Sequence, residues 1–160
     1  MMIDLHTLAS PTLKSTSEVH YLQSNDWEIS LKGYNGFQDT QLLDFEGEVI
    51  FINFWGTWCG PCVSEMPSLQ KLYKAKGKEM KFAFIAMQDK PEKINSFIRK
   101  TGYTMPIYEV NAKFSSEIHP KAYPTTYILN RKGEMVLFER GAADWNAPDV
   151  HHLLEKLIAE

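Results

Sequence analysis

The feature that most constrains the fold of this chain is an apolar run, Val49–Trp55, followed directly by Gly56. The run is nearly all apolar and rich in β-branched and aromatic residues, which is typical of a central strand covered on both faces. Nowhere does the chain contain the stretch of about 18 apolar residues that a membrane-spanning helix needs. We therefore expect a buried sheet with this run at its centre, and no membrane span.

Strands and helices alternate around this run. In chain order, the apolar periodicity predicts strands at 28–32 and 49–55, a helix at 63–73, a strand at 81–87, a helix at 91–101, a short strand at 105–108, a weak helix at 113–118, two strands at 125–129 and 135–138, and a final helix at 150–158. Such alternation implies a parallel core with helices on both faces, to which the late hairpin adds antiparallel strands. We therefore expect an α/β fold with a central mixed sheet and an N-terminal β extension.

Composition and charge indicate one globular domain. The chain has 160 residues, of which 44% are hydrophobic and 23% charged, enough for a single core without disulfide staples. Its 17 basic and 20 acidic residues leave a formal charge of −3, which argues against a nucleic-acid partner. We expect residues 1–26 to be a flexible lead-in, because the segment from about residue 9 to 18 holds few apolar side chains, and residues 27–160 to form the domain.

Two cysteines, Cys59 and Cys62, stand between the buried strand and the next helix. The first turn of a helix has unpaired N–H groups and partial positive charge, so a thiolate there is stabilised and the pKa of Cys59 should fall. The two intervening residues, Gly60 and Pro61, shape a turn that lets the sulfurs meet in a reversible disulfide. We expect Cys59 to be exposed and to attack a client disulfide, and Cys62, one turn deeper, to release the product from the mixed disulfide.

Two other uses of the cysteine pair have less support. A structural zinc ion needs four ligands, and the five histidines show no spacing that completes a site with two cysteines. An inert pair of core cysteines is the second alternative. We expect no metal, and no cofactor beyond the redox-active Cys59–Cys62 disulfide.

Several segments resemble the thioredoxin superfamily. Residues 54–62 (FWGTWCGPC) resemble its active-site segment. Residues 63–67 (VSEMP), 123–129 (YPTTYIL) and 130–134 (NRKGE) are similar to the TlpA/ResA-like branch of thiol-disulfide oxidoreductases. The resemblance covers about residues 27–160 and implies a thioredoxin-like fold.

The resemblance also implies roles for further residues. Pro124 matches the proline whose cis peptide bond faces the active-site disulfide, where it would present the backbone of Tyr123 to an incoming peptide. Trp58 would shield the disulfide. Glu65 matches the acidic residue of a Cys-x-x-Cys-x-x-Glu pattern and would tune the cysteine pKa or relay protons, although acidic residues are also favoured in the first turn of any helix.

Asn53 departs from the pattern of thioredoxins proper, which have an aspartate at this position. Asparagine cannot act as a general base, so the resemblance moves proton transfer to Glu65 or to water. Among the other aromatic residues, we expect Trp55 in the core, and Trp145, in a polar loop, is the best candidate for a surface contact with a client.

We therefore expect a thiol-disulfide oxidoreductase that reduces protein disulfides, similar to the reducing members of the family. Disulfide isomerase or oxidase activity is the alternative within this class. A non-enzymatic redox-gated or copper-handling module is the alternative outside it. A thiol peroxidase is disfavoured, because its Thr-x-x-Cys pattern needs threonine where Gly56 stands.

The expected partners are a client protein with a disulfide or dithiol and an external thiol-redox donor protein, because the chain has no third thiol. We expect the chain to act as a monomer. The resemblance favours an extracytoplasmic location, periplasmic or membrane-tethered in the full-length form, with a cytoplasmic location as the alternative. The start of the chain lacks the basic flank and apolar run of a signal peptide, which fits either a cytoplasmic protein or a trimmed form.

Overall fold

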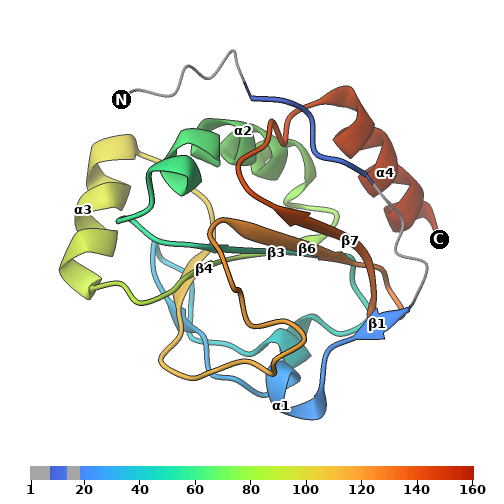
Figure 1. Ribbon diagram of the computed structural model, residues 1–160, viewed down its shortest axis with the longest axis horizontal. Coiled ribbons are helices and arrows are strands. Elements are labelled where there is room, and N and C mark those ends of the chain that lie inside the picture. Colours follow the sequence, from blue (N-terminus) through green and yellow to red (C-terminus); the bar gives the residue numbers. More distant parts are fainter. Residues whose placement is uncertain (1–7, 14–18) are drawn as a thin grey trace.

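The computed structural model describes residues 8–13 and 19–160, and in this part of the chain one mixed sheet forms the centre of the fold (Figure 1). Its strands are β1 (His20–Tyr21), β2 (Lys32–Gly33), β3 (Ile50–Trp55), β4 (Lys81–Ala86), β5 (Ile107–Glu109), β6 (Thr125–Leu129) and β7 (Glu134–Arg140). The order across the sheet is β1-β7-β6-β3-β4-β5-β2. Strands β3, β4 and β5 are parallel, and the others pair antiparallel. The expected α/β fold with a mixed sheet is confirmed.

The two faces of the sheet are covered differently (Figure 1). The long helices α2 (Gly60–Lys76), α3 (Pro91–Thr101) and α4 (Pro148–Ala159) all contribute side chains to one buried apolar cluster. The opposite cluster is closed by the short helix α1 (Ser24–Trp27), the 3-10 turn η2 (Leu42–Phe45) and the segment around Phe114 and Ile118. Helices therefore lie on both faces, but only one face carries long ones.

The side chains of β3 alternate between the two buried clusters on the opposite faces of the sheet. Phe51 and Trp55 belong to the cluster under the long helices, whereas Ile52 and Phe54 belong to the opposite one. Asn53 shares the face of Phe51 and Trp55, because successive side chains of a strand point to opposite faces. The polar amide of Asn53 is thus placed in the apolar layer between the sheet and the long helices.

The N-terminal region differs from the expected lead-in at 1–26. Strand β1 pairs with β7, and the expected boundary between residues 26 and 27 falls inside α1. Further upstream, the Thr12 N–H donates to the Glu139 carboxylate at 3.1 Å. These described segments are thus attached to the domain, and residues 1–7 and 14–18 lie outside the described ones. The expected strand at 28–32 is shorter than predicted: only its end forms β2, with one isolated bridge at Leu31.

The weak helix expected at 113–118 is wrong, because the segment forms turns. Its backbone is held by a carboxylate from α1 instead. Asp26, which is fully buried, accepts hydrogen bonds from the Ser115 N–H at 2.7 Å and from the Ser115 hydroxyl at 2.6 Å. A side-chain acceptor at this point competes with the helical hydrogen bonds that the segment would otherwise make.

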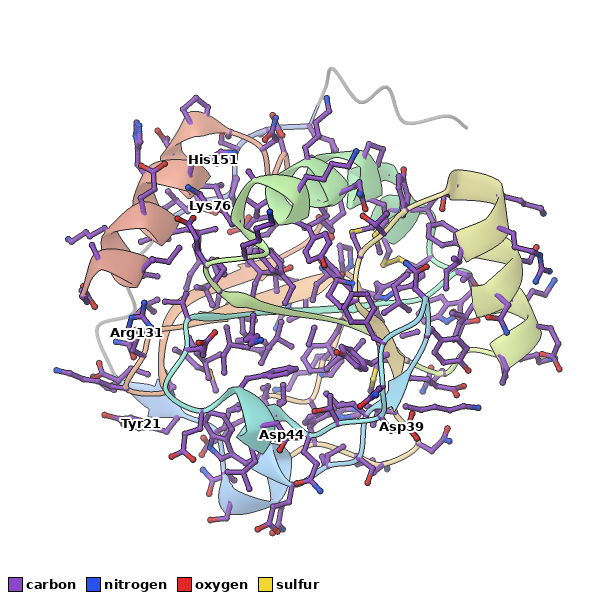
Figure 2. All side chains as sticks on the ribbon, turned by 180° about the vertical axis from the view of Figure 1, so that it is seen from behind. Tyr21, Asp39, Asp44, Lys76, Arg131 and His151 are labelled. Carbon is purple, nitrogen blue, oxygen red and sulfur yellow. A yellow bond between two sulfur atoms is a disulfide. The ribbon has the colours of Figure 1, made fainter. Side chains whose placement is uncertain are left out.

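The end of α2 is tied to α4. Figure 2 shows Lys76 between the two helices, and its ammonium group lies 3.0 Å from the Glu155 carboxylate. Lys76 is itself only 8% exposed, so its aliphatic stem packs in the core while its charge reaches the partner. This contact joins α4 to the end of α2, and the loop that enters α4 meets the middle of α2 through separate hydrogen bonds to Glu65 and Ser68.

Candidate active site

The cysteines lie where the sequence predicts, at the junction of β3 and α2. Cys59 is the N-cap residue of α2, and it forms a disulfide with Cys62 across the first turn, with the two Cα atoms 5.3 Å apart. Gly60 and Pro61 are the first two helical residues, where proline's missing N–H costs nothing. The Cys62 N–H donates to the Cys59 Sγ at 3.3 Å. In the reduced form, the same N–H and the helix N-terminus would stabilise a thiolate on Cys59.

The two sulfurs differ in their access to solvent. Cys62 is fully buried, and Cys59 is 6% exposed, so Cys59 is the more accessible cysteine although less open than expected. Trp58 beside it is 51% exposed. Its ring meets the Tyr123 ring edge-on at 5.1 Å between centroids. The Tyr123–Pro124 peptide bond is cis, as the resemblance implies. Trp58 and Tyr123 thus form an aromatic pair next to Cys59 in the chain, and the Trp58 ring is its open part.

The loop before Cys59 is held by the loop that leaves β4. Asp89 accepts from the Thr57 N–H at 2.7 Å and from the Thr57 hydroxyl at 2.8 Å, and the Trp58 indole N–H donates to the Met87 carbonyl at 3.0 Å. Gln88 between them has φ of 50°, a left-handed conformation that non-glycine residues rarely adopt. Lys90 is the N-cap residue of α3, and the Asp89 carboxylate just before it faces the active-site loop.

Gly56 has a steric role at the same place that sequence reasoning missed. A Cβ atom at this position would overlap the Trp58 indole ring. The glycine therefore lets the indole fold back toward the end of β4 and reach the Met87 carbonyl. A glycine directly after a buried strand is the only signal of this role in the sequence.

Glu65 is fully buried, one turn beyond Cys62 on α2, and three donors surround its carboxylate. The Asn53 amide donates to Oε1 at 3.1 Å. The Ala143 N–H and the Trp145 indole N–H both donate to Oε2, at 3.1 Å and 2.9 Å. These partners come from β3 and from the loop before α4, so three separate parts of the chain meet at this side chain.

Burial raises the pKa of Glu65 to about 7, because the ionised carboxylate loses water. The hydrogen bonds from Trp145, Ala143 and Asn53 oppose this shift, and the charge of Glu139 on β7 adds to it. The carboxyl group is thus placed to change its protonation state near neutral pH, which an exposed glutamate does not do.

The prediction that Trp145 contacts a client at the surface is wrong. Its side chain is fully buried, with its ring edge-on to Phe51 at 5.1 Å. The Trp145 N–H donates to the Ser68 hydroxyl at 3.0 Å, and the Ser68 hydroxyl donates to the Glu65 carbonyl at 2.8 Å. The polar neighbours of Trp145 in sequence suggested exposure, but the indole closes the inner side of the Glu65 site.

Trp55 is fully buried in the core, as expected. Asn53 is also fully buried, and its amide nitrogen donates to Glu65 and, at 3.0 Å, to the Thr126 hydroxyl. The antiparallel register of β3 with β6 pairs Asn53 with Thr126, which brings these two polar side chains together. Within the described ranges, no group of three or more His, Cys, Asp or Glu side chains is placed to hold a metal ion.

The geometry and the sequence together match a known family. The family model described as Redoxin matches residues 19–157. The chain belongs to the Redoxin family. The match begins before β1 and ends within α4, so it includes the whole sheet and the disulfide.

Two curated relatives narrow the placement within the Redoxin family. The chain is 32% identical to the thioredoxin-like protein YneN of Bacillus subtilis over 109 residues, which are 66% of this chain and 64% of that one. It is 36% identical to the thiol-disulfide oxidoreductase ResA of Halalkalibacterium halodurans over 109 residues, 65% of this chain and 60% of that one. The matches thus span less than two thirds of these relatives, and they agree with the TlpA/ResA-like resemblance.

One similar solved structure is a thiol:disulfide interchange protein of the thioredoxin family from Chlorobium tepidum. It superposes with a TM-score of 0.65 at 17% identity, covering 90% of this chain and 99% of that one, and it supports the thioredoxin-like fold. Among the described helices of this Redoxin-family chain, none has the length and apolar character that crossing a membrane requires.

Proposed function

We propose that this protein is a thiol-disulfide oxidoreductase that reduces disulfides in client proteins. The observation that carries the proposal is the disulfide at the start of α2, in which Cys59 is the more accessible sulfur and accepts an N–H from the helix. The similarity to ResA supports the same reaction class. The disulfide itself is the redox group, and no other cofactor is needed for this exchange.

The reaction starts from the reduced dithiol. The Cys59 thiolate attacks one sulfur of a client disulfide, which forms a mixed disulfide and releases one client thiolate. The Cys62 thiolate then attacks the Cys59 sulfur, which releases the second client thiolate and forms the Cys59–Cys62 disulfide. Two electrons pass to the client, and its two thiolates take up two protons. Because the chain has no third thiol, an external thiol-redox donor protein restores the dithiol.

Glu65 is proposed to take part in the proton movements. Cys62 must lose its proton before it attacks the mixed disulfide, and it is buried away from water. Glu65 lies three residues further along α2, so the two side chains share one face of the helix. A carboxyl group with a pKa near neutral is suited to accept this proton and to return it later.

The client is proposed to bind at the rim of Trp58, Tyr123 and Pro124. Tyr123, whose ring contacts the Trp58 ring beside Cys59, would offer its backbone to an extended peptide that adds to it as a strand does. The exposed Trp58 ring offers an apolar contact beside the reacting sulfur. We propose that the protein does this as a monomer outside the cytoplasm, which sedimentation and cell fractionation test directly.

An insulin-disulfide reduction assay tests the main proposal. With dithiothreitol as electron source, the wild type should accelerate the precipitation of reduced insulin chains, and Cys59→Ser should not. The reduction potential of the Cys59–Cys62 pair then separates a reductase from an oxidase or isomerase, since the latter two have distinctly higher potentials. Wild type that leaves the rate unchanged, while binding copper tightly, would instead support the copper-handling alternative.

A further inference from the structure

Asn53 carries an unusual feature for a fully buried side chain. Its amide nitrogen serves two acceptors, Glu65 Oε1 and Thr126 Oγ1. Its amide oxygen has no hydrogen-bond partner; among the described residues it shares this state only with the Trp55 indole N–H. Buried polar atoms are almost always paired, so an orphaned oxygen in the wall of a candidate active site calls for an explanation.

The two oxygens of Glu65 are not equivalent. Both partners of Oε2, the Ala143 N–H and the Trp145 indole N–H, are donors that cannot act as acceptors. A proton on Oε2 would therefore point at two other protons. When Glu65 becomes protonated, the proton must go to Oε1, and this oxygen faces Asn53.

Asn53 in its present orientation cannot receive that proton, because its NH₂ group already points at Oε1. A half-turn of the amide about its last side-chain bond exchanges NH₂ and carbonyl oxygen with almost no change of shape. The carbonyl oxygen would then accept from protonated Oε1 and from the Thr126 hydroxyl, which can donate as well as accept. The NH₂ group would in turn occupy the unpaired position. One end of the amide is unpaired in either orientation. The surroundings other than Glu65 therefore favour neither orientation strongly, and the protonation state of Glu65 decides between them.

We propose that Asn53 is a positioning residue whose side-chain amide turns over when Glu65 gains or loses its proton. It donates to the ionised carboxylate and accepts from the protonated acid, so both states of Glu65 are hydrogen-bonded. Trp145 and Ala143 hold Oε2 fixed and thereby direct the proton to Oε1. The amide oxygen of Asn53, which has no partner in the present orientation, accepts a hydrogen bond only when Glu65 is protonated.

This inference deepens the function proposed above, because it says how the buried acid can exchange a proton without a penalty in either state. The groups around Glu65 leave few other sources of pH dependence. Cys62, on the same helix, does not titrate in the disulfide form, and Asn53, Thr126 and Trp145 are neutral. Glu139 on β7 is the charged group whose field is felt at Glu65, and its own carboxylate is bound by Thr12.

Nuclear magnetic resonance on the disulfide form of the wild-type protein tests the proposal. With ¹⁵N and ¹³C labelling, the Glu65 carboxyl carbon and the Asn53 side-chain NH₂ are followed from pH 5 to pH 9. We expect both signals to change with one shared midpoint, and the NH₂ to lose its hydrogen bond to Glu65 below it. An Asn53 NH₂ that stays hydrogen-bonded to Glu65 on both sides of the Glu65 midpoint would overturn the proposal.

A matched pair of variants tests whether Asn53 switches between donor and acceptor toward Glu65 or acts only as a donor. Trp145→Phe removes a donor that binds Oε2 in both states but binds the ionised carboxylate more strongly than the neutral acid, so it should raise the pKa of Glu65 by about one unit or more. Asn53→Leu removes a group that serves both forms, so the pKa of Glu65 should change much less. An equal rise in both variants would show that Asn53 is a fixed donor and would refute the amide turn.

Glu65→Gln provides an independent arm. Its carbonyl oxygen must face the Ala143 and Trp145 donors, so its NH₂ faces Asn53 and holds the amide in the turned orientation. The Asn53 resonances should then stay at their wild-type low-pH position at every pH, and resonances at the high-pH position would contradict the proposal. Because all these readouts use the disulfide form, they can fail while insulin reduction succeeds, and the reverse also holds.

Discussion

Two hydrogen-bonded clusters meet helix α2 near the disulfide, and each is built around one carboxylate. The outer cluster consists of Thr57, Trp58, Met87 and Asp89 and holds the loop before Cys59. The inner cluster consists of Asn53, Glu65, Thr126, Ala143 and Trp145 and lies behind Cys62. Each carboxylate accepts hydrogen bonds from the backbone and from a side chain, so their local geometry is similar.

The difference lies in access to water. Asp89 is partly exposed, whereas Glu65 is fully buried, and burial raises the pKa of Glu65 toward neutrality. The Asp89 carboxylate fixes the loop before Cys59 through its hydrogen bonds from Thr57. A carboxyl group in the apolar layer gains a charge state that depends on pH, because desolvation penalises the ionised form. The comparison therefore separates a positioning cluster from a titrating one.

The largest effects are expected from the cysteines that the two clusters support. Cys59→Ser should lower the rate of insulin reduction by at least about a hundredfold, because no other nucleophile can begin the exchange. Cys62→Ser should lower turnover similarly but accumulate the mixed disulfide, which mass spectrometry with a disulfide peptide detects. A mixed disulfide that forms in Cys59→Ser instead would reverse the assigned order of the two sulfurs.

Glu65→Gln should change the pH dependence of stability. Between pH 4.5 and 7 the unfolded chain has this group ionised while the folded chain holds it protonated, so wild-type stability falls as pH rises through this range. Once the pH is above both pKa values, the total loss of folding free energy from Glu65 is about 3 kcal/mol. Urea unfolding of the disulfide form at pH 5 and pH 8 should show this loss in wild type and not in Glu65→Gln. Parallel pH profiles for both proteins would contradict the inner cluster's assignment.

Asp89→Ala should destabilise the protein by roughly 1.5–3 kcal/mol, since it leaves the Thr57 N–H without its charged acceptor. Urea unfolding at pH 7 measures this loss. Thr57→Val is the matched control, because it removes only the hydroxyl bond and keeps the backbone one; it should cost about half as much. The wild-type loss of stability between pH 5 and pH 8 should persist in Asp89→Ala, because Glu65 is unchanged. If Asp89→Ala abolished this loss as Glu65→Gln does, the distinction between the two clusters would fail.

Gln88→Gly should have the smallest effect, a stabilisation of up to about 1 kcal/mol. The left-handed backbone of Gln88 is unfavourable for a residue with a Cβ, and glycine removes this cost while it adds some entropy to the unfolded chain. A rise of a few degrees in Tm, measured by circular dichroism, is expected with unchanged insulin reduction. A fall in Tm would mean that the Gln88 side chain itself stabilises the outer cluster.

Short sequence patterns predicted the features that depend only on neighbouring residues in the chain. The apolar run before Gly56 and the cysteine spacing predicted the strand, the helix start and the disulfide, and the family resemblance predicted the cis bond before Pro124. The errors have a common cause. The helix at 113–118 and the surface position of Trp145 were both inferred from neighbours in sequence, but the hydrogen-bond partners of Ser115 and Trp145 lie 89 and 80 positions away.

The sequence by itself therefore determined the reacting group. Two cysteines separated by two residues at the start of a helix meet wherever that helix packs, because one turn of backbone sets their distance. Only the tertiary structure decided the protonation of Glu65. Its burial under the sheet and its donors from Asn53, Ala143 and Trp145 exist only once β3, α2 and the loop before α4 are packed together. Desolvation and hydrogen bonding act on the folded surroundings, and these cannot be derived from the residues next to Glu65 in the chain.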